Sequence, residues 1–139
     1  YIEDPSNKND KFKRVRVRNL LKQLNLEGFN RNKFLLTIKN LKFANENIKF
    51  YTTKNLKENL RIINKKSAIL KENFFLQSEE VVFRSLVEVI RIIGKKYYSV
   101  RGKKIENIID LIKSNSSLKV TLGGCIIKKV NRTIILLKE

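Results

Sequence analysis

The sequence contains no histidine and a single cysteine, Cys125. Without a second cysteine the chain forms no internal disulfide, and this fits a reducing compartment such as the cytoplasm. Zinc sites built from the usual nitrogen and sulfur ligands are excluded within the chain, and so are histidine-dependent general bases and triads. Most familiar hydrolases are therefore excluded, and we expect no metal site.

Long apolar runs are also lacking. No run approaches the roughly 18 to 20 residues of a membrane-spanning helix. The first residue, Tyr1, is followed by acidic and turn residues instead of a basic and apolar signal. We therefore expect no membrane partner, and a start at Tyr1 instead of Met indicates a fragment of a longer protein.

Acidic residues are few beside basic ones, with 13 Asp and Glu against 31 Lys and Arg and a net charge of +18 over 139 residues. A field of this sign recruits nucleic acid, anionic membrane or acidic proteins. An AT-rich genome offers a second explanation, because it enriches Lys, Asn and Ile without selection for binding. A polyanionic partner is the default expectation.

The N-terminal basic segment raises a choice between strand and helix, because Arg and Val alternate over positions 14–18. Helical spacing continues much further along the chain, at Val17, Leu20, Leu21 and Leu24. The pattern therefore predicts an amphipathic helix with this apolar stripe buried. Beside the stripe we expect a cationic ridge of Arg14, Arg18 and Lys22, with Arg16 on the other side.

The remaining pattern predicts an α+β fold, mainly helical with a small antiparallel sheet at the C-terminus. Gly28 ends the first helix, and asparagines after it cap a second helix over about 32–50. Short apolar runs within 52–77 resemble small strands. A helix starts after Ser78 and stops at Gly94, another spans Ile105 to Ile112, and the segment from Leu118 alternates like strands around a Gly123-Gly124 bend.

Three pieces occur in order: "EDPSNKNDKFKRVRVR", "FRSLVEVIRIIGKKYYSVRGKKIENIIDLI" and "TLGGCIIKKVNRTIILLKE". Together they resemble tRNA(Ile)-lysidine synthase of the short alphaproteobacterial type. The resemblance implies that residues 1–27 are the tail of a catalytic PP-loop domain. It implies that residues 28–139 are a helical tRNA-binding region ending in strands.

The resemblance also implies a reaction for the parent enzyme, an ATP-dependent ligase that forms a carbon-nitrogen bond. With ATP and Mg²⁺ the family adenylates C2 of the wobble cytidine in an isoleucine tRNA with a CAU anticodon, and lysine then displaces AMP. Its Ser-Gly-Gly-x-Asp-Ser loop, whose amides would cradle phosphate, does not occur in this sequence. We expect that the chain alone binds no ATP or Mg²⁺ and is inactive, with lysine and ATP bound by another domain.

The family pattern assigns candidate residues. Asp4, Ser6 and Asn7 match its turn motif, and Arg14 and Arg18 match two arginines beside the active-site face, which makes them catalytic candidates. Guanidinium groups at this spacing can bracket a phosphate or a base. The plainer alternative is a solvated helix flank, or a pairing with acidic residues of the missing domain.

A second candidate surface is the "GKKYYSVRGKK" segment, in which tyrosines are interleaved with cations. This combination offers stacking faces and phosphate-neutralising charge. Alternatively, one tyrosine packs beneath the loop and the lysines are simply hydrated. The complete set of predicted RNA-binding residues is Arg14, Arg16, Arg18, Lys22, Lys95, Lys96, Tyr97, Tyr98, Arg101, Lys103 and Lys104.

Two other interpretations of the whole chain remain open. It could be a noncatalytic basic nucleic-acid-binding or ribosome-associated module, or a protein of the membrane surface. Cys125 lies in an apolar strand pattern and is expected to be an inert core residue. Glu79 and Glu80 are expected to serve the positive end of a helix dipole and solubility, not catalysis.

Overall fold

The computed structural model of the chain describes residues 11–96, 100–115 and 117–139. The chain divides into two compact units, Tyr1–Ala44 and Asn45–Glu139. Helices and an antiparallel sheet follow in the predicted order, so the α+β class is confirmed.

The first unit contains α1 (Lys13–Leu26) and the beginning of α2 (Arg31–Asn59). Gly28, at φ 89°, follows the end of α1, and its amide donates to the carbonyl of Asn25 at 3.1 Å. Asn30 caps α2, since its Oδ1 accepts from the amide of Lys33 at 3.0 Å. The predicted helices and their boundary are thus confirmed, although α2 runs nine residues beyond the expected end at position 50.

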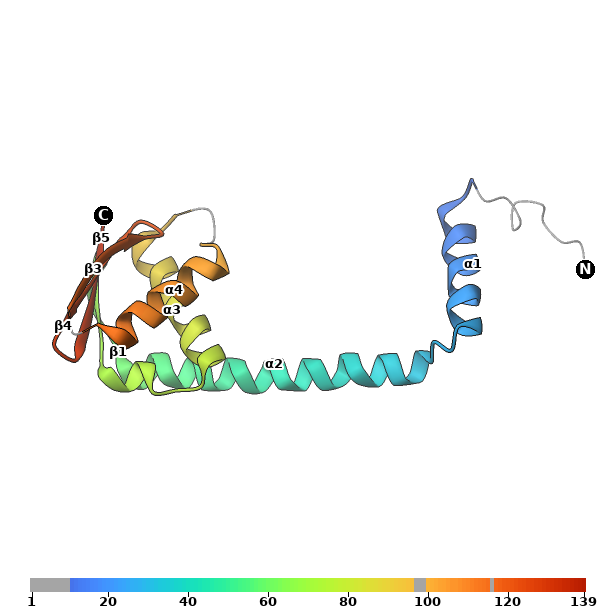
Figure 1. The fold of residues 1–139 in the computed structure, drawn as a ribbon, viewed down its shortest axis with the longest axis horizontal. Helices are drawn as coiled ribbons and strands as arrows, with labels where there is room; N and C mark the ends of the chain where they lie inside the picture. The colour runs from blue at the N-terminus through green and yellow to red at the C-terminus, as the bar shows by residue number, and fades with distance from the viewer. Residues whose placement is uncertain (1–10, 97–99, 116) are drawn as a thin grey trace, which may run out of the picture. The chain divides into compact units, whose positions relative to one another are not determined.

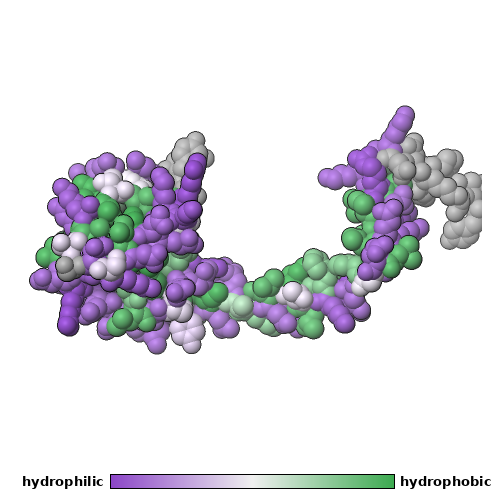
Figure 2. All heavy atoms as spheres, in the orientation of Figure 1, coloured by the Kyte–Doolittle hydropathy of each residue, from purple (hydrophilic) through white to green (hydrophobic). Residues whose placement is uncertain are grey.

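The burial expected for the apolar stripe of α1 is wrong. Its members, Val17, Leu20, Leu21 and Leu24, are all exposed, Leu20 at 57%. The buried residue of α1 is instead Val15, the neighbour of the ridge arginines. Figure 2 shows hydrophobic residues, in green, at the surface of α1 and α2. Periodicity identified an amphipathic helix, but no described element of this unit covers its apolar face.

The second unit contains one five-stranded sheet, in the order β1-β2-β5-β4-β3, and every neighbouring pair is antiparallel. The predicted small strands within 52–77 are β1 (Leu60–Asn64) and β2 (Ser67–Leu70). The predicted C-terminal strands are β3 (Leu118–Leu122), β4 (Cys125–Val130) and β5 (Thr133–Lys138). Strands from both ends of this unit therefore form one sheet, because β2 pairs with β5.

Two helices cover one face of the sheet, α3 (Glu79–Gly94) and α4 (Gly102–Ser114), as Figure 1 shows. A short 3-10 helix, η2 (Glu72–Phe75), precedes them. The apolar positions predicted to face the core are buried on both helices. They pack with Phe74, Ile127 and Leu136 into a single hydrophobic cluster.

The ends of α3 lie where the sequence predicts, but for different physical reasons. Ser78 occupies the N-cap, yet its side chain makes no capping hydrogen bond. Gly94 is the last helical residue, and the left-handed residue after it is Lys95, at φ 52°. Gly94 is therefore not a left-handed C-terminal cap, and another feature must explain the glycine.

Buried asparagines join the end of α2 to the rest of the second unit. Asn55 is 2% exposed, and its Nδ2 donates to the carbonyl of Phe74 at 3.2 Å and to Oγ of Ser85 at 3.1 Å. Asn59 donates in turn to Oδ1 of Asn55 at 2.9 Å. A buried polar group costs little only when it is hydrogen-bonded, so this network fixes the last turns of α2 against η2 and α3.

Candidate functional site

Exposed cations flank the segment that connects α3 to α4. Lys95 and Lys96 follow α3, and Arg101, Lys103 and Lys104 stand at the start of α4; all five side chains are exposed. Tyr97 and Tyr98 lie outside the described residues, so their predicted stacking role stays a prediction. The structure thus brings five of the predicted RNA-binding cations to the two ends of one loop.

A close backbone approach fixes the first end of this loop. A Cβ added to Gly94 would lie 2.1 Å from the carbonyl oxygen of Gly123 and 3.1 Å from Sγ of Cys125. No real Cβ is tolerated at such a distance from a backbone atom without a shift of the chain. Gly94 is therefore a glycine because the β3–β4 turn packs directly against the end of α3.

The same turn supports the second end of the loop. Gly123 has φ 60°, and a Cβ there would lie 2.5 Å from Cγ2 of Ile90 and 2.7 Å from Cγ2 of Val100. Gly124 has φ 78° and packs against the side chain of Lys96. Both glycines thus combine a left-handed backbone with a crowded site, and the paired glycines serve as a mount for the basic loop.

Cys125 follows the Gly123-Gly124 turn, is buried, and is unreactive. Its Sγ is 3.6 Å from the carbonyl of Ile90, to which it donates. Burial, with a smaller contribution from the charge of Glu139, raises the pKa of the Cys125 thiol to about 11, against a lowering influence of Lys96. The thiolate is the reactive form, so the thiol is protonated and inert at neutral pH.

Most of the cations at the two ends of the loop are free of ion pairs with other described residues. Lys96 Nζ lies 3.9 Å from a carboxylate oxygen of Glu139, an exposed pair of little energetic weight. Lys95, Arg101, Lys103 and Lys104 form no ion pair with a described residue. Their charge is therefore free to act on an external anion.

The ridge on α1 is also exposed. The guanidinium of Arg14 lies 5.4 Å from the ring centroid of Phe12, and Arg16 donates to the carbonyl of Lys11 at 2.9 Å. Arg18 and Lys22 lie one and two turns beyond Arg14, with exposed side chains. The predicted turn motif of Asp4, Ser6 and Asn7 lies outside the described residues. The roles assigned to the ridge and the turn stay predictions.

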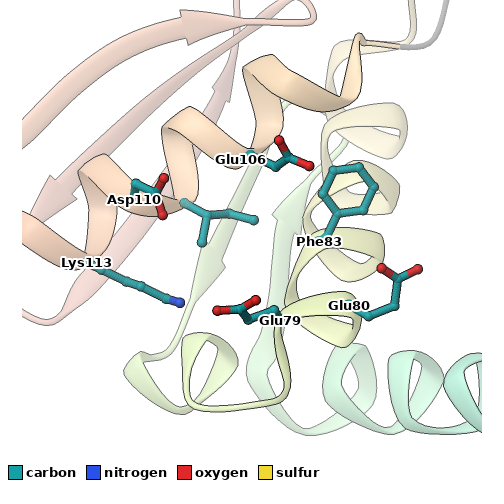
Figure 3. Close-up of a pocket in the computed structure, with 7 residues that line it drawn as sticks. Glu79, Glu80, Phe83, Glu106, Asp110 and Lys113 are labelled. Carbon is teal, nitrogen blue, oxygen red and sulfur yellow. The ribbon is translucent and has the colours of Figure 1, made fainter.

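Acidic side chains gather on the helical face of the second unit. A hollow of about 360 Å³ between α3 and α4 is lined by Glu79, Glu80, Phe83, Glu106, Ile109, Asp110 and Lys113, and Figure 3 shows the four carboxylates around it. Glu80 also forms an ion pair with Arg84 at 2.6 Å. Within the described part of the chain, no three metal-ligating side chains are placed to hold a metal ion. Sequence reasoning missed this hollow because its members come from two helices.

No described helix is both long and apolar enough to span a bilayer.

Comparison with known proteins gives the relatives of the chain. It is 27% identical over 141 residues to the tRNA(Ile)-lysidine synthase of Wolbachia sp. subsp. Brugia malayi (strain TRS). It is 28% identical over 141 residues to that of Wolbachia pipientis wMel. The predicted resemblance is confirmed. Each alignment covers 100% of this chain and 33% of the relative, so the chain spans about a third of the length of these lysidine synthases. No protein-family model matches it.

Two pieces of sequence that carry the lysidine synthase resemblance meet in space. The glycine of "RIIGKK" is Gly94, and the glycines of "TLGGC" are Gly123 and Gly124. Residues separated widely in the chain therefore form one packed contact, and this contact holds the basic loop.

Proposed function

We propose that the chain is the tRNA-binding portion of a tRNA(Ile)-lysidine synthase acting in the cytoplasm. The observation that carries the proposal is the similarity of the entire chain to two curated synthases. The parent enzyme would use ATP and Mg²⁺ to adenylate the carbonyl oxygen on C2 of the wobble cytidine in isoleucine tRNA with a CAU anticodon, with release of pyrophosphate. Lysine would then attack C2 through its amine, and AMP would leave.

This chain would supply binding and orientation instead of the nucleotide chemistry. A phosphate-cradling loop needs backbone amides that are free to face a ligand. Around the paired glycines, the space that such a ligand needs is filled by Ile90, Val100 and the stem of Lys96. ATP, Mg²⁺ and lysine would therefore bind to the part of the parent enzyme that precedes this region in the family pattern, and the chain would be inactive alone.

The basic loop would hold the phosphate backbone of the tRNA. Exposed lysines and arginines neutralise phosphates and release counterions, a contribution that does not depend on base sequence. A rigid mount limits the loss of entropy when such side chains bind, and the contact of Gly94 with Gly123 provides that mount. Arg14 and Arg18 would approach the substrate base or its phosphates near the active-site face.

The division of the chain follows the same proposal. Residues 1–27 would be the tail of the catalytic domain, and residues 28–139 would be the tRNA-binding region. The two compact units instead divide after Ala44, within α2, so this division follows the family motifs and not the packing.

A triple substitution in the loop tests the proposal, with Arg101, Lys103 and Lys104 each changed to Gln. Fluorescence anisotropy with labelled tRNA measures affinity across a salt series. We expect the logarithmic salt slope of the affinity to fall in magnitude by about 2 to 3, because each lost phosphate contact removes roughly 0.7 to 0.9. An unchanged slope would show that these three side chains contact no phosphate of the tRNA.

The alternative, a noncatalytic nucleic-acid-binding module, is favoured by the charge of +18 alone. Arg18→Ala in a full-length synthase that contains this region separates the two. If the chain is part of a lysidine synthase, lysidine formation should be lost while the protein remains folded. If the chain is a noncatalytic module, the substitution should have no effect on this reaction.

A further inference from the structure

The face of the sheet that α3 and α4 leave uncovered carries positive charge only. The five strands contain no Asp or Glu, and their basic residues Arg61, Lys119 and Lys128 lie on this face. The other two strand lysines, Lys129 and Lys138, pair with the buried Ile134 and Cys125 and belong to the covered face. The five strands also contain no aromatic residue. No described element of the second unit lies over this face, which is the side away from the two helices in Figure 1.

The strand register aligns the cations in a single row across the sheet. Lys119 pairs with Lys128, Lys128 with Ile135, Ile135 with Ile69, and Ile69 with Arg61. The neighbouring row, which contains Ile127, Leu136 and Ala68, is buried beneath the helices. Because successive residues of a strand alternate between faces, the row from Lys119 to Arg61 points outward.

One pair in this row is unfavourable unless an anion is present. Lys119 and Lys128 are directly opposite each other on adjacent strands, and like charges so placed destabilise a sheet. No hydrogen bond or ion pair joins either side chain to another described residue. The neighbouring Lys129 differs, since its Nζ donates to the carbonyl of Ile112 at 2.6 Å.

The same two lysines border a shallow hollow at the edge of the sheet. It has a volume of about 290 Å³ and is lined by Ser117, Leu118, Lys119, Lys128, Lys129 and Val130. Ammonium groups and a serine side chain around a concave surface are suited to phosphate oxygens. The hollow lies at one end of the row, and Arg61 on β1 marks the other end.

We propose that the outer face of the sheet is a second RNA-binding surface, which holds the phosphodiester backbone along the row from Lys119 to Arg61. The proposal rests on the proposed tRNA-binding function and adds a surface to it. Adjacent strands lie about 4.8 Å apart, so the row is roughly 19 Å long. Ile69 and Ile135 at its centre are half-buried and offer an apolar floor for ribose.

The distribution of charge over the second unit favours the sheet over the hollow between α3 and α4 as a phosphate site. Five acidic residues belong to the helical layer: Glu79, Glu80, Glu88, Glu106 and Asp110. The strands carry only cations among their charged residues. Four of these carboxylates line the hollow between α3 and α4, so repulsion disfavours phosphate at that hollow, while the outer face of the sheet attracts it. Without aromatic side chains the face provides no base stacking, so it holds RNA irrespective of sequence.

The test is a triple variant of the complete chain, Arg61→Gln, Lys119→Gln and Lys128→Gln. The matched control is Lys49→Gln, Lys54→Gln and Lys57→Gln, which removes the same charge from exposed positions of α2 in the same unit. Anisotropy with labelled tRNA across a salt series measures both. We expect the sheet variant to bind at least tenfold more weakly than the control, with a salt slope smaller by about 2 to 3.

The outcomes separate the two proposals. If the unaltered chain binds no tRNA, the proposed function fails, and the sheet surface fails with it. If the chain binds tRNA and the two triple variants behave alike, the sheet surface alone is overturned. Circular dichroism checks that both variants fold.

A second measurement uses the unaltered chain and needs no variant. Lysines are acetylated with and without saturating tRNA, and mass spectrometry reads the protection of each. We expect protection of Lys119 and Lys128 but not of Lys49 and Lys54. Equal modification of all four would overturn the proposal, and so would binding to phosphatidylserine vesicles that depends on the sheet lysines while tRNA binding does not.

Discussion

The substitution Gly94→Ala tests the packing that mounts the basic loop. The added methyl would lie 2.1 Å from the backbone oxygen of Gly123 and 3.1 Å from Sγ of Cys125. Because the nearest atom belongs to the backbone, relief requires the β3–β4 turn and the end of α3 to move apart. Overpacking of this kind costs about 1 to 3 kcal/mol, against a helix-propensity gain of at most about 1 kcal/mol.

We therefore expect Gly94→Ala to lower the free energy of unfolding by about 1 to 2 kcal/mol. Urea unfolding followed by far-ultraviolet circular dichroism measures it. The matched control is Gly102→Ala at the start of α4, where a Cβ would lie 3.5 Å from Cζ of Phe83, an ordinary contact. The control should be neutral or slightly stabilising.

Displacement of the loop should also lower the affinity for RNA. We expect Gly94→Ala to weaken tRNA binding in the anisotropy assay although it removes no charge, while Gly102→Ala leaves binding unchanged. Equal stability and equal affinity of the two alanine variants would refute the idea that the contact of Gly94 with Gly123 positions the loop.

Other perturbations test further parts of the structure. Lys95→Gly should raise the free energy of unfolding by about 1 kcal/mol, because Lys95 is left-handed at φ 52°; Lys95→Ala, which removes the same charge, should give no such gain in urea unfolding. Asn55→Ala should lower stability by about 1 to 3 kcal/mol in the same assay, since it leaves the buried carbonyl of Phe74 and the hydroxyl of Ser85 without the hydrogen-bond donor of Asn55. The folded-state pKa of Cys125, about 11, lies above its ordinary value of 9.0, so its contribution to stability is complete below pH 9 and is lost as the pH rises towards 11. The stability advantage of the unaltered chain over Cys125→Ala should accordingly shrink across that interval, and a constant difference would contradict the assigned environment.

Local patterns predicted the helices and strands of the second unit well. The apolar spacing of α3 and α4 identified the residues that the structure buries, because a helix face that packs on a sheet imposes the helical period on the sequence. The short runs that became β1 and β2 were also predicted as strands. Their pairing partner was not, because the contact of β2 with β5 joins residues far apart in the chain.

The failures have the same origin in long-range contacts. The spacing of Val17 and Leu20 indicated an apolar face, but periodicity does not reveal what covers that face, and the structure leaves it exposed. Gly94 was predicted as a helix stop from its residue type, whereas in the structure the position requires glycine because the carbonyl of Gly123 approaches it closely. The cation row of the sheet was missed entirely, since Arg61 and Lys119 become part of one surface only through the register of five strands.

The most direct test of the central proposal is an anisotropy titration of the 139-residue chain. The probes are isoleucine tRNA with a CAU anticodon and elongator methionine tRNA, which shares that anticodon, over a salt series. We expect binding to the isoleucine tRNA with a Kd of about 1 μM or tighter at physiological salt, and a salt slope that corresponds to at least about four neutralised phosphates. Absence of measurable binding at about 100 μM chain, or binding without salt dependence, would contradict it.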